Sequence, residues 1–189
     1  MNENIFRAYD IRGNAYEDLT DDVVQKIGFV LGDYVVKAGD QSIYVGHDSR
    51  LSKDRIKKNL IVGITSVGVD VYDLGLVPTP MVYYATKTTG IEHGVMITGS
   101  HNPKEDNGMK IVINGNPVSG IEIKDKVINF KENKKKNGKV ISHDLTDQYL
   151  NEIKEKILIK KPLKVVLDAG NGASGPLARK VFEGIGIDI

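Results

Sequence analysis

Apolar residues recur along the chain in two patterns, one typical of amphipathic helices and one typical of buried strands. Apolar spacing of three to four residues predicts two helices, which begin after the N-caps Thr20 and Ser52. Three more are predicted: a short helix that follows Pro80 and ends at Thr86, one over Ile121–Lys131 and one over Gln148–Ile157. Short apolar runs predict strands at Ser42–Val45, Val69–Leu74, Gly94–Ile97 and Lys110–Ile113. The alternation predicts an α/β fold, with a mixed sheet inside a three-layer domain.

The pattern restarts further along the chain. Leu163–Leu167 predicts another strand, followed by a glycine-rich turn and a helix from Pro176. Asp48 and Asp70 in the first stretch stand almost as far apart as Asp168 and Asp188 in the second, which we interpret as weak repetition of one β-α-β unit.

This repetition predicts two similar domains in series. We place the first domain at residues 1–145, and a linker helix with the start of the second domain at residues 146–189. Because two strands and one helix cannot close a core, we expect the second copy to be incomplete and the chain to be a truncated product.

Composition and charge limit the classes of binding partner that we expect for this protein. The net charge is +1 and no run approaches the ~20 apolar residues of a membrane helix, so we expect neither nucleic acid nor membrane as a partner. The basic run Lys131–Lys139 lacks interleaved aromatic residues and is interpreted as a solvated helix end. The absence of cysteine excludes disulfides and thiolate metal sites, and we expect a cytoplasmic protein.

The segment Thr-Gly-Ser-His-Asn-Pro, residues 98–103, is the strongest candidate for chemistry. It follows an apolar strand, and ligands of open α/β sheets bind at the carboxyl ends of strands. Ser100 is a candidate nucleophile, with His101 and Lys110 as neighbours suited to a phosphoryl group. A polar turn with a capping serine is the alternative. A serine hydrolase is disfavoured, since its G-x-S-x-G elbow needs glycine where Asn102 stands.

Further segments add a resemblance. Phe6–Gly13, Val45–Arg50, Val77–Pro80, Gly94–Lys110 and Val165–Gly175 together resemble the α-D-phosphohexomutase family, in the family's order and over essentially the whole chain. The opening Phe-Arg-Ala-Tyr-Asp-Ile-Arg-Gly is similar to the phosphomannomutase/phosphoglucomutase branch.

The resemblance implies an activity. Ser100 would carry a phosphoryl group and exchange it between the 1- and 6-positions of a mannose or glucose phosphate, through a bound bisphosphate. Mg²⁺ would bind the phosphate on Ser100 and an aspartate-rich loop in the second domain. That loop and the other sites would belong to C-terminal domains missing here, so this chain alone is expected to be essentially inactive.

The resemblance also implies roles for single residues. Lys110 matches a general acid/base, with a surface lysine as the alternative. His101 matches a residue for proton transfer or orientation, with a structural hydrogen bond as the alternative. Tyr9 and Arg12 match residues that bind substrate at the rim of the site, although Arg12 could instead form a salt bridge with Asp10.

The segment after the first strand gives weaker indications. Many relatives have arginine where His47 stands, so a charge role at that position is in doubt. Arg50 is a weaker candidate, since Asp48-Ser49-Arg50 is also an ordinary strand-end turn.

A competing hypothesis is dinucleotide binding. Gly170–Gly175 reads G-x-G-x-x-G between a predicted strand and helix, and Asp188 falls near the position of a ribose-binding acid. Asp168 stands where apolar residues usually precede these glycines, and the resemblance explains the loop without a nucleotide. An NAD-binding α/β domain is therefore the alternative function.

Overall fold

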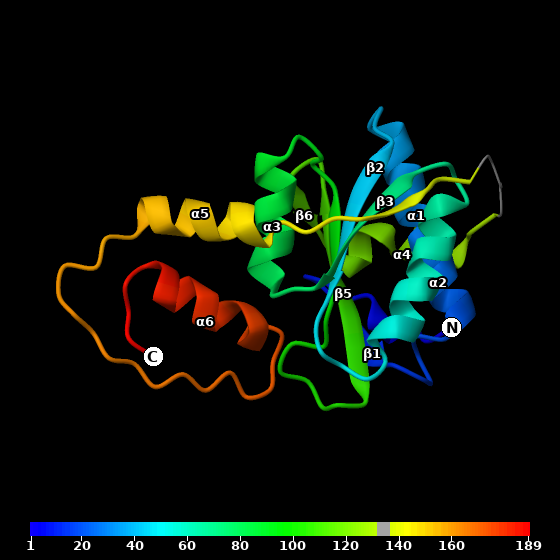
Figure 1. Ribbon diagram of the computed structural model, residues 1–189. Coiled ribbons are helices and arrows are strands. Elements are labelled where there is room, and N and C mark those ends of the chain that lie inside the picture. The colour runs from blue at the N-terminus through cyan, green and yellow to red at the C-terminus, as the bar shows by residue number, and fades with distance from the viewer. Residues whose placement is uncertain (132–136) are drawn as a thin grey trace.

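The computed structural model describes residues 1–131 and 137–189, and a mixed β-sheet with helices on both faces forms its main body (Figure 1). Among the described residues the sheet has seven strands, in the order β1-β5-β4-β2-β3-β7, with β6 paired to β5. Their bounds are β1 Ile11–Asn14, β2 Ser42–His47, β3 Asp70–Leu76, β4 Gly94–Ile97, β5 Asp106–Ile113, β6 Asn116–Val118 and β7 Val140–Ser142.

Strand direction determines where the loops gather. β2 runs parallel to β3 and β4, and β3 runs parallel to β7, whereas β5 is antiparallel to β1, β4 and β6. His47 at the end of β2 pairs with Ile97 at the end of β4. The loops that follow these two strands therefore leave the same edge of the sheet side by side.

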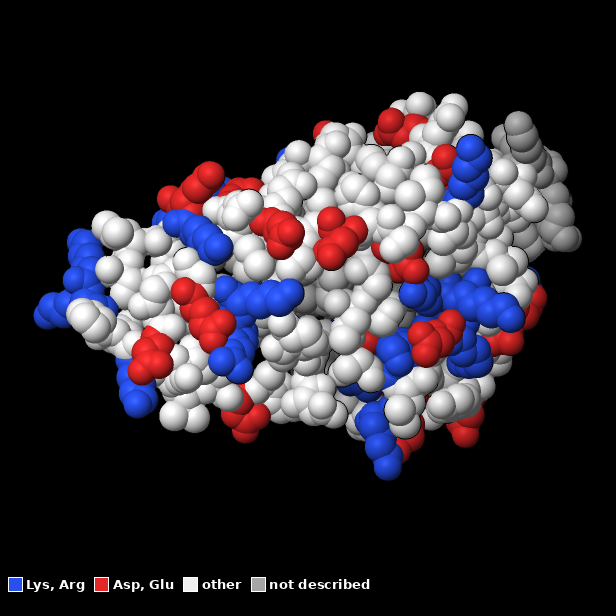
Figure 2. Space-filling view, in the orientation of Figure 1, with Lys and Arg blue, Asp and Glu red and all other residues white. Residues whose placement is uncertain are grey.

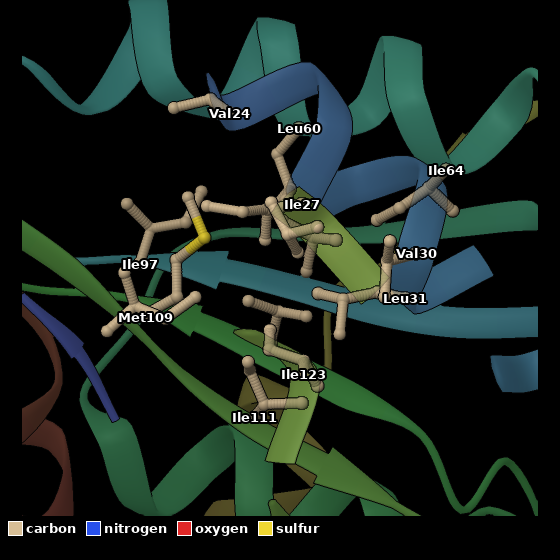
Figure 3. Packing of buried hydrophobic residues seen from close by; sticks show 14 of the residues in the cluster. Val24, Ile27, Val30, Leu31, Leu60, Ile64, Ile97, Met109, Ile111 and Ile123 are labelled. Carbon is tan, nitrogen blue, oxygen red and sulfur yellow. The ribbon is translucent and has the colours of Figure 1, made fainter. Parts of the chain in front are cut away.

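Helices α1 (Asp21–Lys37), α2 (Lys53–Thr65) and α4 (Gly120–Ile128) contribute to the core on one face of the sheet (Figure 3). Helix α3 (Thr79–Thr88) and the start of α5 (Thr146–Lys156) contribute to a smaller apolar cluster on the other face. The backbones of α1 and α2 approach closely, because a Cβ atom at Gly28 would lie 2.2 Å from the Leu60 carbonyl oxygen. The 3-10 helix η1 (Glu3–Ile5) precedes β1, and α6 (Gly175–Gly184) packs beside α5.

Most predicted helices form, but some of their caps and end points differ from the prediction. Thr20 caps α1 as predicted, since its Oγ1 accepts from the Val23 N–H at 3.5 Å. Ser52 precedes α2 but makes no cap hydrogen bond; its hydroxyl accepts from Asn107 Nδ2 at 2.9 Å instead. The helix predicted over Ile121–Lys131 ends at Ile128.

The strand predicted at Leu163–Leu167 is wrong. Lys164 forms one isolated parallel bridge with Asp188, and the rest of the segment is irregular. Two extended segments with a single helix between them gain too little packing to form a regular ladder. In the first stretch β2, α2 and β3 form a β-α-β unit, whereas the second stretch has one helix, α6, between segments joined by a single bridge.

Two expectations concern the surface. Residues 132–136 of the basic run lie outside the described residues. In the described part of the chain, no helix combines the length and apolarity that crossing a bilayer requires. On the face shown in Figure 2, acidic and basic side chains are interspersed.

Candidate functional site

A cavity of about 670 Å³ lies at the edge where β2 and β4 end. The loop after β2 and the loop after β4 line it, together with the start of α3 and the glycine-rich loop before α6. Its lining includes Ser49, Arg50, Thr79, Ser100 and Asn171. This is the edge at which open α/β sheets bind their ligands.

Ser100 occupies a strained position in that cavity. Its φ of 52° is in the left-handed region, which a residue other than glycine adopts at a cost of about 1–2 kcal/mol. The Ser100 N–H donates to Thr98 Oγ1 at 2.8 Å, and the Gly99 N–H donates to Asp48 Oδ2 at 3.2 Å. These bonds hold an exposed serine hydroxyl at the tip of a stiff strand-to-loop junction. Backbone strain of this kind concentrates at functional sites.

His101 is next to the hydroxyl. Its Nδ1 lies 3.4 Å from Ser100 Oγ, and both side chains are exposed. The structure thus brings together the predicted nucleophile and one of its two predicted neighbours.

Lys110 and Arg12 meet at one carboxylate oxygen. Asp10 Oδ2 accepts from Arg12 Nε at 2.9 Å and from Lys110 Nζ at 3.1 Å, and it lies 2.9 Å from Arg12 Nη2. Strand pairing explains this meeting, since Arg12 on β1 is opposite Gly108 on β5, two residues before Lys110. Gly108 leaves room for the arginine, because a Cβ atom there would lie 2.8 Å from Arg12 Cδ.

The two residues predicted to bind substrate are placed differently. Arg12 is 6% exposed, and its Nη1 donates to the Thr98 carbonyl at 2.9 Å, so it links Asp10 to the backbone just before Ser100. The salt bridge with Asp10, which was the alternative interpretation, is present. Tyr9 is 87% exposed.

Two residues that organise this site had only a minor place in the sequence analysis: Arg50 as a weaker candidate, and Asp10 as a salt-bridge partner of Arg12. Asp10 joins the two cationic side chains, and Arg50 donates to the carbonyls of Ser100 and Asn102 at 2.9 and 2.8 Å. Both lie inside the segments that carry the resemblance, which is the signal that marks them. His47 is buried, and its Nδ1 lies 2.9 Å from the Asp48 carbonyl oxygen.

The glycine-rich loop lines the same cavity as the serine. Ser49 Oγ donates to the Asn171 carbonyl at 3.3 Å, and both Gly170 and Asn171 have positive φ. No regular strand precedes this loop within residues 158–170, and the dinucleotide fingerprint requires one. The geometry therefore gives the NAD-binding alternative no support.

Potential metal-ligating side chains do not gather into clusters in the described ranges. Residues 1–131 and 137–189 contain no group of three or more histidine, cysteine, aspartate or glutamate side chains arranged to hold a metal ion.

Comparison with known proteins assigns the chain to a family. The profile of a family described as phosphoglucomutase/phosphomannomutase, alpha/beta/alpha domain I, matches residues 3–153. A phosphomannomutase/phosphoglucomutase of Pseudomonas syringae pathovar tomato is 39% identical over 99% of the chain, and a phosphoglucomutase of Neisseria meningitidis serogroup A is 36% identical over 98%.

A solved structure shows the same arrangement. The phosphoglucomutase/phosphomannomutase family protein of Burkholderia thailandensis superposes with a TM-score of 0.92 at 36% identity and covers the whole chain. The chain spans 41% of the length of the two curated relatives and 43% of the solved one.

Proposed function

Because this chain belongs to the phosphoglucomutase/phosphomannomutase family, we propose that it supplies the phosphoryl-carrying serine of a phosphohexomutase. The reaction moves a phosphoryl group between the 1- and 6-positions of mannose or glucose phosphate, through a bound bisphosphate. We further propose that a second, similar domain begins within residues 146–189, and that domains present in the longer relatives complete the site.

The observation that carries this proposal is the placement of Ser100. Its hydroxyl is exposed on a strained loop that lines the cavity at the strand ends. Phosphoserine carries about −1.5 to −2 charges at neutral pH, so cationic groups nearby favour it. Lys110 is a half-exposed cation held by Asp10, and Arg12 ties that carboxylate to the backbone of Thr98.

The residues of this chain divide the chemistry between them. When a sugar hydroxyl attacks phosphorus and loses its proton, the bond from phosphorus to Ser100 Oγ breaks and Oγ gains a proton. We assign both proton movements to Lys110: its ammonium group, directed by Asp10, gives a proton to Ser100 Oγ, and the resulting amine accepts the proton that the sugar hydroxyl loses. His101, 3.4 Å from Oγ, orients the hydroxyl, and exposed Tyr9 meets the incoming sugar phosphate.

Arg12 and the metal complete the proposal. Of the two η nitrogens of Arg12, Nη1 donates to the Thr98 carbonyl and Nη2 contacts Asp10. If Arg12 also binds substrate, it would do so through the guanidinium N–H groups that these two contacts do not use. Mg²⁺, bound to an oxygen of the phosphate on Ser100 and to ligands outside this chain, would neutralise charge on that group. We expect the whole protein to act in the cytoplasm.

The test is mutase activity of the whole protein in a coupled assay. Ser100→Ala is expected to abolish turnover, because no oxygen remains to accept the phosphoryl group. Lys110→Ala is expected to lose about 10²–10⁴-fold, the usual contribution of a positioned acid or base. Lys156→Ala, which removes an exposed lysine on α5, serves as the control and should retain activity. Normal turnover by Ser100→Ala would refute the proposal.

A further inference from the structure

The side chain of Arg50 runs beneath the loop that carries Ser100. Its Nη2 donates to the carbonyls of Ser100 at 2.9 Å and Asn102 at 2.8 Å. Its Nη1 donates to the carbonyls of Pro103 and, at 2.8 Å, Asp106. One side chain thereby binds four backbone carbonyls of a single loop.

These bonds use all of the hydrogens on the two η nitrogens. Each η nitrogen of a guanidinium carries two N–H groups, and each of the four has a carbonyl partner here. The remaining nitrogen, Nε, lies 3.5 Å from Asp48 Oδ2, which balances the charge. An arginine near a phosphoryl group is usually a phosphate ligand. Arg50 has no pair of η N–H groups left to bind a phosphate in this way.

Gly99 is the second half of the arrangement. A Cβ atom at this position would lie 2.1 Å from both Cζ and Nε of Arg50. The Arg50 side chain is only 11% exposed, and its guanidinium group packs against the backbone directly before Ser100. We call Arg50 and Gly99 together the loop clamp.

The loop clamp acts on the residue whose backbone is strained. Ser100 has a φ of 52°, and its own carbonyl is one of the four that Arg50 holds. Unfavourable backbone conformations persist where surrounding contacts over-determine them. Arg50 supplies those contacts from the loop that follows β2, whereas the Ser100 loop follows β4.

We propose that Arg50 is a positioning residue that holds Ser100 in its left-handed conformation for phosphoryl transfer, and that it binds no substrate phosphate itself. This inference rests on the proposed mutase function. A misplacement of about 1 Å costs on the order of 100-fold in rate, so the clamp affects turnover without touching the sugar.

The experiment compares variants of the whole protein by steady-state kinetics. Arg50→Ala is expected to lower kcat about 100-fold with KM for the hexose phosphate little changed, because the interaction lost is not with substrate. Millimolar guanidinium should restore part of kcat by occupying the vacated space. Arg179→Ala removes an exposed arginine on α6 and should show neither loss nor rescue.

A double variant locates the rescue. In Arg50→Ala/Gly99→Ala the added methyl group fills the space that the guanidinium needs, so rescue is expected to vanish. Equal rescue in the single and double variants would contradict the clamp. An increase in KM with kcat preserved would instead make Arg50 a phosphate ligand and overturn the proposal.

Amide hydrogen exchange separates failure of the clamp from failure of the mutase function. In Arg50→Ala, exchange at Asn102 and Asp106 should rise at least tenfold while exchange in α1 stays constant, and guanidinium should reverse the rise. If the wild type showed no mutase activity, the proposed function would fail, but this result would still support the clamp. Unchanged hydrogen exchange in the Ser100 loop of Arg50→Ala would refute the loop clamp.

Discussion

Two arginines, one on a strand and one on a loop, hold the backbone around the serine. Arg12, on β1, donates to the Thr98 carbonyl, and Arg50, after β2, donates to carbonyls from Ser100 to Asp106. Between these two anchors the chain turns through the left-handed conformation of Ser100. The nucleophile is therefore presented by a backbone that the two side chains hold on both sides.

The strain at Ser100 predicts a difference between two variants that both lack the hydroxyl. Ser100→Gly should be about 1 kcal/mol more stable than Ser100→Ala, because glycine adopts a positive φ without the Cβ penalty. Both should lack mutase activity. Urea unfolding with equal m-values measures the difference, and equal stability of the two variants would show that the backbone relaxes when the hydroxyl is removed.

At this scale the sequence indicates candidate site residues only through the types of their side chains, and the roles of these residues stay predictions. Ser100, His101 and Lys110 form a recognisable motif, and Ser100 and His101 lie next to each other in the structure. Arg50 was underrated because its partners are carbonyls, which every residue carries and no pattern marks. Asp10 was underrated because its role depends on the register that brings β1 beside β5.

Helix α4 supports the segment that carries Asp10. Its first residue, Gly120, is packed so closely that a Cβ atom would lie 2.5 Å from the Asp10 carbonyl oxygen, and the Ile121 N–H donates to the Arg7 carbonyl. The helix begins with a capping box in which Ser119 Oγ accepts from the Glu122 N–H and Glu122 Oε1 accepts from the Ser119 N–H. The capping box therefore stabilises the start of α4 and, through it, the adjacent segment that carries Asp10.

The capping box predicts a pH dependence. The Ser119 backbone N–H, and then its hydroxyl, lower the pKa of Glu122 below its usual value. The stabilisation is therefore present at neutral pH and is lost as pH falls through the lowered pKa. Glu122→Ala should be less stable than wild type at pH 7, and the gap should shrink at pH below the usual range of glutamate.

Glu122→Gln is the matched control, because glutamine also serves in a capping box. It should retain more stability than Glu122→Ala at neutral pH. Chemical unfolding at several pH values measures all three proteins. A gap between wild type and Glu122→Ala that does not change with pH would show that the carboxylate contributes nothing through its charge.

The regular elements were largely predictable, and the exceptions have physical reasons. Long amphipathic helices and the buried strands β2 and β4 carry strong apolar patterns. β1, β6 and β7 were not predicted because each has only three or four residues and, in β6 and β7, exposed side chains. The segment Leu163–Leu167 has the composition of a strand, but it makes a single bridge in the described structure.

At the scale of the whole molecule, the cavity at the strand ends brings together segments far apart in sequence. The Ser100 loop and the glycine-rich loop of residues 170–174 both line it. The family relatives are more than twice as long as this chain, which spans 41% of their length. We therefore expect the mutase reaction to need further domains, and this chain alone to show essentially no turnover.

Phosphopeptide mapping of the whole protein, after incubation with a hexose bisphosphate, tests the central claim most directly. We predict one phosphoryl group on the peptide that contains Ser100, and none on the same peptide of Ser100→Ala. A turning-over enzyme whose phosphoryl group lies on any other residue, or which never becomes phosphorylated, would contradict the account.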